Sequence, residues 1–321
     1  MNKKPIIIVA GEPNSVFLEI FFKSLKRNYY KSPLILIVNK KLLIKQMHHL
    51  GFNFKLNQID LNSVNFEKLN NKKINIINVD YNFKNAFEKI SKKSNKYIKK
   101  SFKIALEILK KNKFSKFING PVSKRYFLEG KSLGITEYLA KQSKIKDEVA
   151  MLIFNDKLSV SPVTTHLALK DVHKYISKEK IKSHIRLISQ FYKKRFKKNP
   201  RIAITGLNPH CESNFNDCEE DAIISPTIKY LKNKKFRVEG PFPADTIFMQ
   251  KHLKKFDVIV GMYHDQVLSP MKALFGFDAI NITLGLPFVR ISPDHGPNSS
   301  MLGKNLSDPK SLMEALKFLD K

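Results

Sequence analysis

Three histidines hold equivalent places in the sequence, because each lies in a polar loop directly after a short apolar run. They are His166 in VTTHLALKD, His210 in TGLNPHCES and His264 in GMYHDQ. In open α/β sheets, ligands bind beyond the carboxyl ends of the strands, so the three imidazoles could converge at one cleft. Three imidazoles leave an open position on a metal and suit Zn²⁺ or another late divalent ion. The alternative for each one singly is a hydrogen-bonded histidine in a turn.

Three residues downstream of His264 suit recognition of a phosphate or a carboxylate. Lys272, Asn281 and Arg290 each lie near a glycine or proline turn. Arg290 carries the most weight, since only 7 of the 58 basic residues are arginine and its planar fork binds such anions through two bonds. Lys272 has the plain alternative of being one surface lysine among many.

Two carboxylates complete the candidate chemistry. Asp265 follows His264 directly, and Asp245 lies in GPFPADTIF. Either carboxylate could accept a proton or orient a ligand. Asp245 could equally cap the amino end of a helix over TIFMQKHL. The spacing of Cys211 and Cys218 fits no zinc pattern, so we interpret both as small residues.

The elements that must position these side chains alternate along the chain. Short β-branched runs and helical patterns follow one another, which predicts an α/β fold with a largely parallel or mixed sheet. Apolar residues at helical spacing predict helices through 98–109 and 181–192, and Asp308 with Pro309 marks the start of a last helix. The predicted strands cover residues 5–10, 33–38, 74–79, 116–119, 149–154, 158–164, 201–206, 256–262 and 278–284.

The composition excludes several classes of function. The chain has 58 Lys and Arg against 28 Asp and Glu in 321 residues, but its lysines are spread over nearly every segment and its arginines and aromatics do not cluster. We therefore expect no nucleic-acid partner. The first apolar run stops at Glu12, too early for a signal or membrane segment, so we expect a soluble, cytoplasmic protein. No Rossmann fingerprint and no P-loop pattern occurs.

A series of short segments extends over almost the whole chain: AGEP (10–13), NGPVSK (119–124), GITEYLA (134–140), TTHLALKDV (164–172), GLNPH with CEE (206–210 and 218–220), GPFPADT (240–246), YHDQ (263–266) and NITLGLPFVRISPDHG (281–296). In content and order this set resembles the 4-hydroxythreonine-4-phosphate dehydrogenase family of pyridoxal phosphate biosynthesis. The resemblance implies two α/β/α domains around a cleft, as in isocitrate and isopropylmalate dehydrogenases. It places a cofactor-side domain at 1–130 with 285–321, and a metal, substrate and dimerisation domain at 131–284.

The resemblance also implies roles for individual residues. The family's metal ligands fall on the three histidines above, in a site completed across a homodimer interface, with His264 as the shared ligand and Zn²⁺, Mg²⁺ or Co²⁺ as the ion. Its substrate-binding positions fall on Thr136, Lys272, Asn281 and Arg290. The implied reaction is NAD- or NADP-dependent oxidation of the C3 hydroxyl of 4-phosphooxy-L-threonine. The resulting β-keto acid loses CO₂ and yields 3-amino-2-oxopropyl phosphate.

Two departures from the family pattern keep other functions open. The family has GHTE where this chain has GITE, so Ile135 replaces a polar substrate contact. After DHG the chain reads PNSSMLGKN (297–305) in place of the family's TALDxAGxG, which helps to bind the cofactor. One alternative is a dehydrogenase of threonate or erythronate 4-phosphate. Another is a non-catalytic relative that has kept only the fold.

Overall fold

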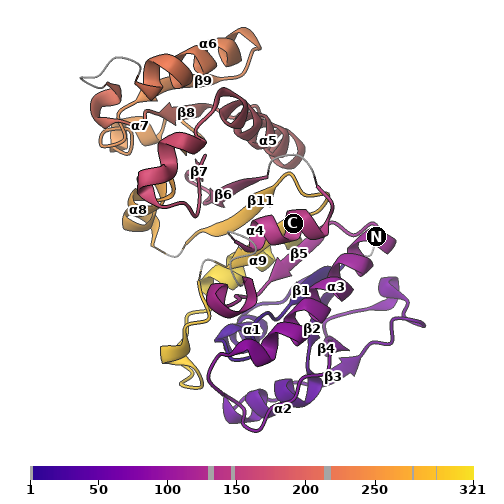
Figure 1. Ribbon diagram of the computed structural model, residues 1–321. Helices are drawn as coiled ribbons and strands as arrows, with labels where there is room; N and C mark the ends of the chain where they lie inside the picture. Colours follow the sequence, from indigo (N-terminus) through magenta and orange to yellow (C-terminus); the bar gives the residue numbers. More distant parts are fainter. Residues whose placement is uncertain (1–2, 129–133, 146–148, 213–217, 277, 294) are drawn as a thin grey trace. The chain divides into compact units, whose positions relative to one another are not determined.

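The structure is a computed structural model that describes residues 3–128, 134–145, 149–212, 218–276, 278–293 and 295–321. The chain forms two compact units, Met1–Tyr138 with Pro287–Lys321 and Leu139–Leu286. Each unit combines helices with strands (Figure 1), so the predicted α/β class is confirmed. The predicted boundary between residues 130 and 131 lies outside the described residues, and the domain roles stay predictions.

The first unit carries a parallel sheet with the strand order β3-β4-β2-β1-β5-β12. Its central strands are continuous apolar runs, because both faces of such a sheet are covered; all four residues of β1 are buried. The elements are β1 (Ile6–Val9), α1 (Phe17–Arg27), β2 (Leu34–Val38), α2 (Lys40–His49), β3 (Leu56–Gln58), β4 (Ile74–Asn78), α3 (Asn95–Lys111), β5 (Lys116–Asn119), β12 (Val289–Pro293) and α9 (Lys310–Asp320), while α4 (Ile135–Gln142) crosses the division.

The second unit carries a mixed sheet with the order β11-β6-β7-β10-β8-β9. β6 is antiparallel to β11 and to β7, whereas the pairs β7–β10, β10–β8 and β8–β9 are parallel. The elements are β6 (Ala150–Phe154), β7 (Ser159–Pro162), α5 (Lys178–Phe196), β8 (Ile202–Thr205), α6 (Ser225–Asn233), β9 (Val238–Phe242), α7 (Gln250–Leu253), β10 (Val258–Gly261), α8 (His264–Phe275) and β11 (Ile280–Leu284).

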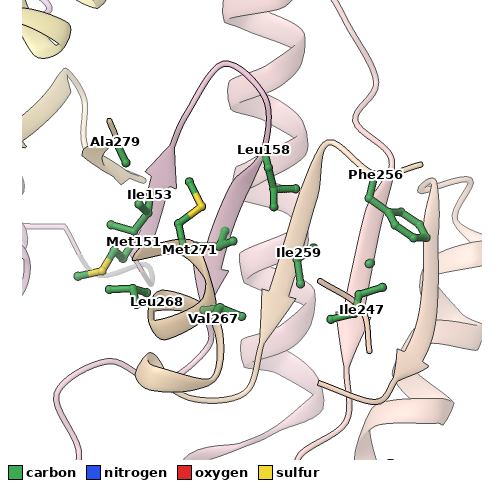
Figure 2. Close-up of a cluster of buried hydrophobic side chains, with 12 residues drawn as sticks. Met151, Ile153, Leu158, Ile247, Phe256, Ile259, Val267, Leu268, Met271 and Ala279 are labelled. Atoms are coloured by element: carbon green, nitrogen blue, oxygen red, sulfur yellow. The ribbon is translucent and has the colours of Figure 1, made fainter. Parts of the chain in front are cut away.

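Helix α8 is anchored in an apolar layer of the second unit. Figure 2 shows side chains from β6, β10 and α8 directed into this layer, among them Met151, Ile259 and Val267. Burying each such side chain stabilises the fold by about 1.5–3 kcal/mol. Because α8 begins at His264, its packing in the apolar layer fixes the start of α8 relative to the sheet. Helix α5 is held to the same sheet separately, since Tyr192 donates a hydrogen bond of 2.9 Å to Ser159 of β7.

The predicted strands and helices are confirmed, and three further strands were missed. β3 is only three residues long and polar, β9 contains Gly240 and Pro241, and β12 has an arginine at its second position. Each of these features weakens the alternating apolar pattern that indicates a strand. The last helix begins as expected, since Asp308 Oδ1 accepts a hydrogen bond of 2.9 Å from the backbone N–H of Lys310.

The described part of the chain contains no helix of the length and apolar character needed to span a bilayer.

Candidate active site

The three histidine loops leave the sheet at the same edge. β7, β10 and β8 are adjacent and parallel, so their carboxyl ends lie side by side. His166 follows β7, His264 begins α8 directly after β10, and His210 lies in a short turn of helix after β8. The sequence predicted that each loop follows a strand. The structure adds that these are three neighbouring strands of one sheet, with the His264 strand in the middle.

Two of the three imidazoles lie close together. The ring centroids of His166 and His264 are 6.0 Å apart, with an angle of 37° between the ring planes. Nδ1 of His264 lies 2.6 Å from Oδ1 of Asp265. An ionised carboxylate only accepts hydrogen bonds, so Nδ1 would carry the proton in this pair, and in a neutral imidazole Nε2 then keeps its lone pair for a metal ion. A carboxylate bound to the second nitrogen is the usual support of a metal-ligating histidine.

His210 is held in an unusual backbone conformation. Its φ is +58°, and the φ of the following Cys211 is +63°. Left-handed non-glycine residues cost about 1–2 kcal/mol each and cluster at functional sites. The imidazole of His210 is exposed.

The donor chemistry of the three loops fits a divalent ion, since neutral imidazoles on adjacent strand ends suit Zn²⁺ and similar metals. Within the described residues of a single chain, however, no group of three or more His, Cys, Asp or Glu side chains is arranged to hold an ion. The three-histidine metal site therefore stays a prediction. Of its three members, the structure brings together His166 and His264.

In the first unit the structure brings Arg290 and Thr136 together. Nε of Arg290 donates a hydrogen bond of 2.7 Å to Oδ1 of Asn119, and Nη1 lies 3.5 Å from Oγ1 of Thr136. The Arg290 side chain is fully buried. Burial lowers the pKa of Arg290 to about 10, and the nearby Glu137 partly opposes this shift. Sequence reasoning did not single out Asn119, although it ends a strand and begins the segment NGPVSK.

The remaining polar candidates lie in the second unit. Lys272 is half-buried on α8, and Asn281 is the second residue of β11, opposite Ile153 of β6. Oδ1 of Asn281 is buried and accepts no hydrogen bond from the described residues. A buried acceptor without a donor costs about 1–3 kcal/mol, so a ligand that donates there would recover that free energy.

Asp245 does not cap a helix. Residues 244–248 form turns after β9, and α7 begins only at Gln250, so the alternative of an N-cap at Asp245 is wrong. The backbone N–H groups of Thr246 and Ile247 both bond to the carbonyl of Pro243, which closes a turn in place of the first helical turn. The Asp245 carboxylate is exposed and thereby available to a ligand.

Two glycines of the first unit serve close contact between its loops. A Cβ on Gly11 would lie 2.4 Å from the carbonyl oxygen of Pro121, and one on Gly120 would lie 2.1 Å from that of Ala10. The backbone N–H of Glu12 bonds to the same Pro121 carbonyl at 2.8 Å. The glycines thus allow close contact between the loops after β1 and β5. This contact does not identify which residues bind a nicotinamide cofactor.

Comparison with known proteins gives a consistent picture. The family described as pyridoxal phosphate biosynthetic protein PdxA matches residues 30–319 of the chain. A 4-hydroxythreonine-4-phosphate dehydrogenase of Sulfurihydrogenibium sp. (strain YO3AOP1) is 37% identical over 323 residues, which cover 98% of this chain and 96% of that protein. A D-threonate 4-phosphate dehydrogenase of Pectobacterium atrosepticum is 39% identical over 181 residues, which cover 56% of this chain and 55% of that protein. A crystal structure of 4-hydroxythreonine-4-phosphate dehydrogenase from Klebsiella pneumoniae matches with a TM-score of 0.83 at 27% identity, covering 98% of this chain and 97% of that one.

Proposed function

The chain belongs to the PdxA family of pyridoxal phosphate biosynthetic proteins, and from this premise we propose that it oxidises 4-phosphooxy-L-threonine in pyridoxine and pyridoxal phosphate biosynthesis. Membership makes the protein an oxidoreductase of the dehydrogenase type, which uses a nicotinamide cofactor. The specific substrate, the choice of NAD or NADP and the divalent ion belong to the proposal. The observation that carries it is the set of three histidine loops at the carboxyl ends of adjacent parallel strands.

The proposed reaction has two steps. First, the C3 hydroxyl proton passes to a base while the C3 hydrogen leaves as hydride, which NAD⁺ or NADP⁺ would accept as the oxidant, so that C3 becomes a ketone. Then the bond between C2 and the carboxylate breaks with loss of CO₂, and the electron pair left on C2 takes up a proton, which gives 3-amino-2-oxopropyl phosphate. Asp245 and Asp265 are the proposed bases, because both carboxylates are exposed and Asp265 contacts a histidine of the strand-end group.

His166, His264 and His210 would hold the divalent ion, and the ion when bound would lower the pKa of the substrate hydroxyl and polarise the new ketone. Lys272 and Arg290 would hold the anionic ends of the substrate. Thr136 and Asn281 would complete recognition, and the buried acceptor of Asn281 suits the amino or hydroxyl hydrogen of such a substrate. We further propose a homodimer in which a second copy of the chain completes the site.

A second candidate is a dehydrogenase of threonate 4-phosphate or erythronate 4-phosphate. Two observations favour it: a relative of this chain is named for D-threonate 4-phosphate, and Ile135 at the start of α4 cannot form the hydrogen bond of the family's histidine. Losing one polar contact costs about 1–3 kcal/mol, which is enough to change substrate preference.

A turnover assay separates these functions. The full chain is offered each of the three phosphorylated acids with NAD⁺ or NADP⁺, and formation of the reduced nicotinamide is followed with and without a chelator. We expect the highest kcat/KM with 4-phosphooxy-L-threonine, loss of activity on chelation, and its return with Zn²⁺, Mg²⁺ or Co²⁺. His264→Ala should abolish turnover, whereas His173→Ala, which alters an exposed histidine that is not a candidate ligand, should not.

Three outcomes would contradict parts of the proposal. Faster turnover of a sugar acid phosphate would support the second candidate. Activity that survives chelation would exclude the metal. If neither cofactor is reduced with any of the acids and neither raises the melting temperature, the chain is a non-catalytic relative.

A further inference from the structure

A cavity of about 400 Å³ lies in the first unit, at the amino ends of β2 and β4. Its wall includes Leu34 and Ile74, the first residues of these strands, and the last turn of α1. β2 and β4 run parallel to β1 and β5, so Asn119 at the carboxyl end of β5 lies at the opposite edge of the sheet. Among the described residues that line the cavity, none is assigned to the proposed reaction. Pockets for small molecules occupy about 300–1,000 Å³, so this one can hold a ligand of its own.

Every charged side chain described in the wall of this cavity is positive. The set comprises Lys26, Arg27, Lys55, Lys72 and Lys73. The chain as a whole has 28 acidic against 58 basic residues, so a wall with five cations and no carboxylate exceeds the general excess of positive charge. The cations of α1 also complement the negative end of the helix dipole, but the three lysines directly before β3 and β4 lie outside any helix. A hollow lined by one sign of charge concentrates ions of the other sign, which predicts an anionic ligand.

Aromatic rings supply the apolar part of the wall, and they belong to Phe21, Tyr29, Tyr30 and Phe54. Phe54 is held by stacking, since its ring centroid lies 6.0 Å from that of Phe22 at an interplanar angle of 22°. Tyr29 is 82% exposed. An exposed aromatic ring gains free energy when a second flat ring stacks on it and removes water from both. The wall therefore offers one fixed ring and one exposed ring to a flat aromatic ligand.

Two polar groups of the wall are available as donors. Apart from their contact with each other, Nδ2 of Asn28 and the hydroxyl of Tyr30 have no hydrogen-bond partner among the described residues. Asn28 is only half-buried, so its amide can turn toward a ligand oxygen. Burial, together with the carboxylates of Glu314 and Asp320 outside the wall, raises the pKa of Tyr30, so its hydroxyl remains a donor. Donors without an acceptor are costly, and an anionic oxygen in the cavity would satisfy them.

Asn71 fixes the two sides of the wall to each other. Its Oδ1 accepts a hydrogen bond of 2.8 Å from the backbone N–H of Leu34. Its Nδ2 donates to the carbonyls of Tyr30 and Ser32, both at 2.8 Å. The lysine pair before β4 follows Asn71 directly, so one side chain holds these lysines and the aromatic segment around the same space. A pocket that is formed in advance loses less conformational entropy when a ligand binds.

We propose that this cavity binds a phosphorylated compound with a flat aromatic ring. The ring packs against Tyr29 and Phe54, and the phosphate pairs with the lysines that precede β3 and β4. Two classes of compound share this chemistry, the phosphate esters of vitamin B6 and the nucleoside monophosphates. The first class includes pyridoxal phosphate, for whose biosynthesis the family is named. The inference goes beyond the proposed function, because it uses neither the histidine loops nor a metal ion.

The test is calorimetric titration of the full chain with pyridoxine 5′-phosphate and, separately, with AMP. Pyridoxine 5′-phosphate is chosen because it lacks the aldehyde that would react with the many lysines. We expect one of these esters to bind at one site per chain. Pyridoxine or adenosine without the phosphate should bind at least about tenfold more weakly, since bonds to a charged group are lost. Raising the ionic strength should also weaken binding of the ester.

Lys72→Gln combined with Lys73→Gln removes two of the cations, and we expect it to weaken binding of the ester by about tenfold or more. The matched control is Lys110→Gln combined with Lys111→Gln. These are two adjacent exposed lysines at the end of α3, in the same unit but outside the cavity wall, and their loss changes the net charge equally. The control should leave the affinity unchanged. All four side chains are exposed, and the melting temperature without ligand checks that each protein is folded.

Tyr29 provides an independent variant. Tyr29→Leu should weaken binding about tenfold because it removes the stacking ring, whereas Tyr29→Phe keeps the ring and should retain the affinity. Binding of only one ester, or tighter binding of one, identifies the class of ligand and supports the site.

Three results would overturn the inference: neither ester binds, the affinity is the same in the Tyr29→Leu and Lys72/Lys73 variants, or the control pair weakens binding as much. Failure of the chain to oxidise 4-phosphooxy-L-threonine would contradict the proposed function alone.

Discussion

The environment of Arg290 determines what this side chain contributes. An isolated buried cation would be very costly, but this guanidinium meets the amide oxygen of Asn119 and the hydroxyl of Thr136. Although burial lowers its pKa to about 10, the group stays charged at neutral pH. Arg290 can therefore serve as a fixed positive charge. Ile135 directly precedes Thr136, the threonine that Arg290 contacts.

Restoring the family's histidine at this point is expected to change substrate preference. Ile135→His should raise kcat/KM for 4-phosphooxy-L-threonine relative to threonate 4-phosphate by about tenfold or more, because a polar contact is worth about 1–3 kcal/mol. The measurement is a competition between the two acids, with Ile135→Leu as the apolar control. An equal change for both acids would show that residue 135 does not distinguish them.

Among the elements, strand β10 is fixed at both of its ends. Gln266 binds its carboxyl end through Met262, and Asp257 binds its amino end. The Asp257 carboxylate accepts a hydrogen bond of 2.8 Å from the backbone N–H of Arg201 and lies 2.7 Å from Nζ of Lys198. Burial acts to raise the pKa of Asp257, yet the bonds from Arg201 and Lys198 outweigh it and the pKa is lowered from 3.8.

Removing this charge should destabilise the protein in a pH-dependent way. We expect Asp257→Asn to lower the free energy of unfolding at neutral pH by about 1–2 kcal/mol, since hydrogen bonds to charged groups contribute about 1.5–3 kcal/mol and asparagine keeps one acceptor. A lowered native pKa means that the stabilisation is complete above 3.8 and is lost as the pH falls through the native value. Urea unfolding should therefore show the two proteins converging below pH 3.8. A constant difference down to that range would contradict this account.

At the scale of the whole molecule, the candidate residues are divided between the two units. Thr136 and Arg290 belong to the first unit, and the histidines, Asp245, Asp265, Lys272 and Asn281 belong to the second. The rings of His166 and His264 lie together within one chain. If a second copy completes the site, a dimer of one His210 variant and one His264 variant is informative. In such a mixed dimer each chain can supply the histidine that the other lacks.

Co-expressed chains carrying His210→Ala and His264→Ala should recover activity that neither variant has alone. Random pairing of two chains makes half of the dimers mixed, and one of the two shared sites in each is intact, so about a quarter of the original activity is expected. The measurement uses separately tagged chains, so that mixed dimers can be purified. No recovery in purified mixed dimers would show that both histidines act within a single chain.

The sequence by itself determined the α/β class and the place of each histidine after a strand, because buried parallel strands appear as continuous apolar runs and their ends are visible as polar breaks. It also located the last helix, whose cap at Asp308 is a local signal. Local patterns could not locate β9 and β12, where a Gly-Pro pair and an arginine interrupt the apolar pattern.

Only the tertiary structure decided which strands are neighbours. β10 lies between β7 and β8, although β8 precedes β10 in the chain, and this order brings the histidine loops to one edge with Gln266 between them. It also decided that Arg290 bonds to Asn119, 171 residues away. Strand order and such bonds depend on contacts between residues far apart in the sequence, which local periodicity does not encode.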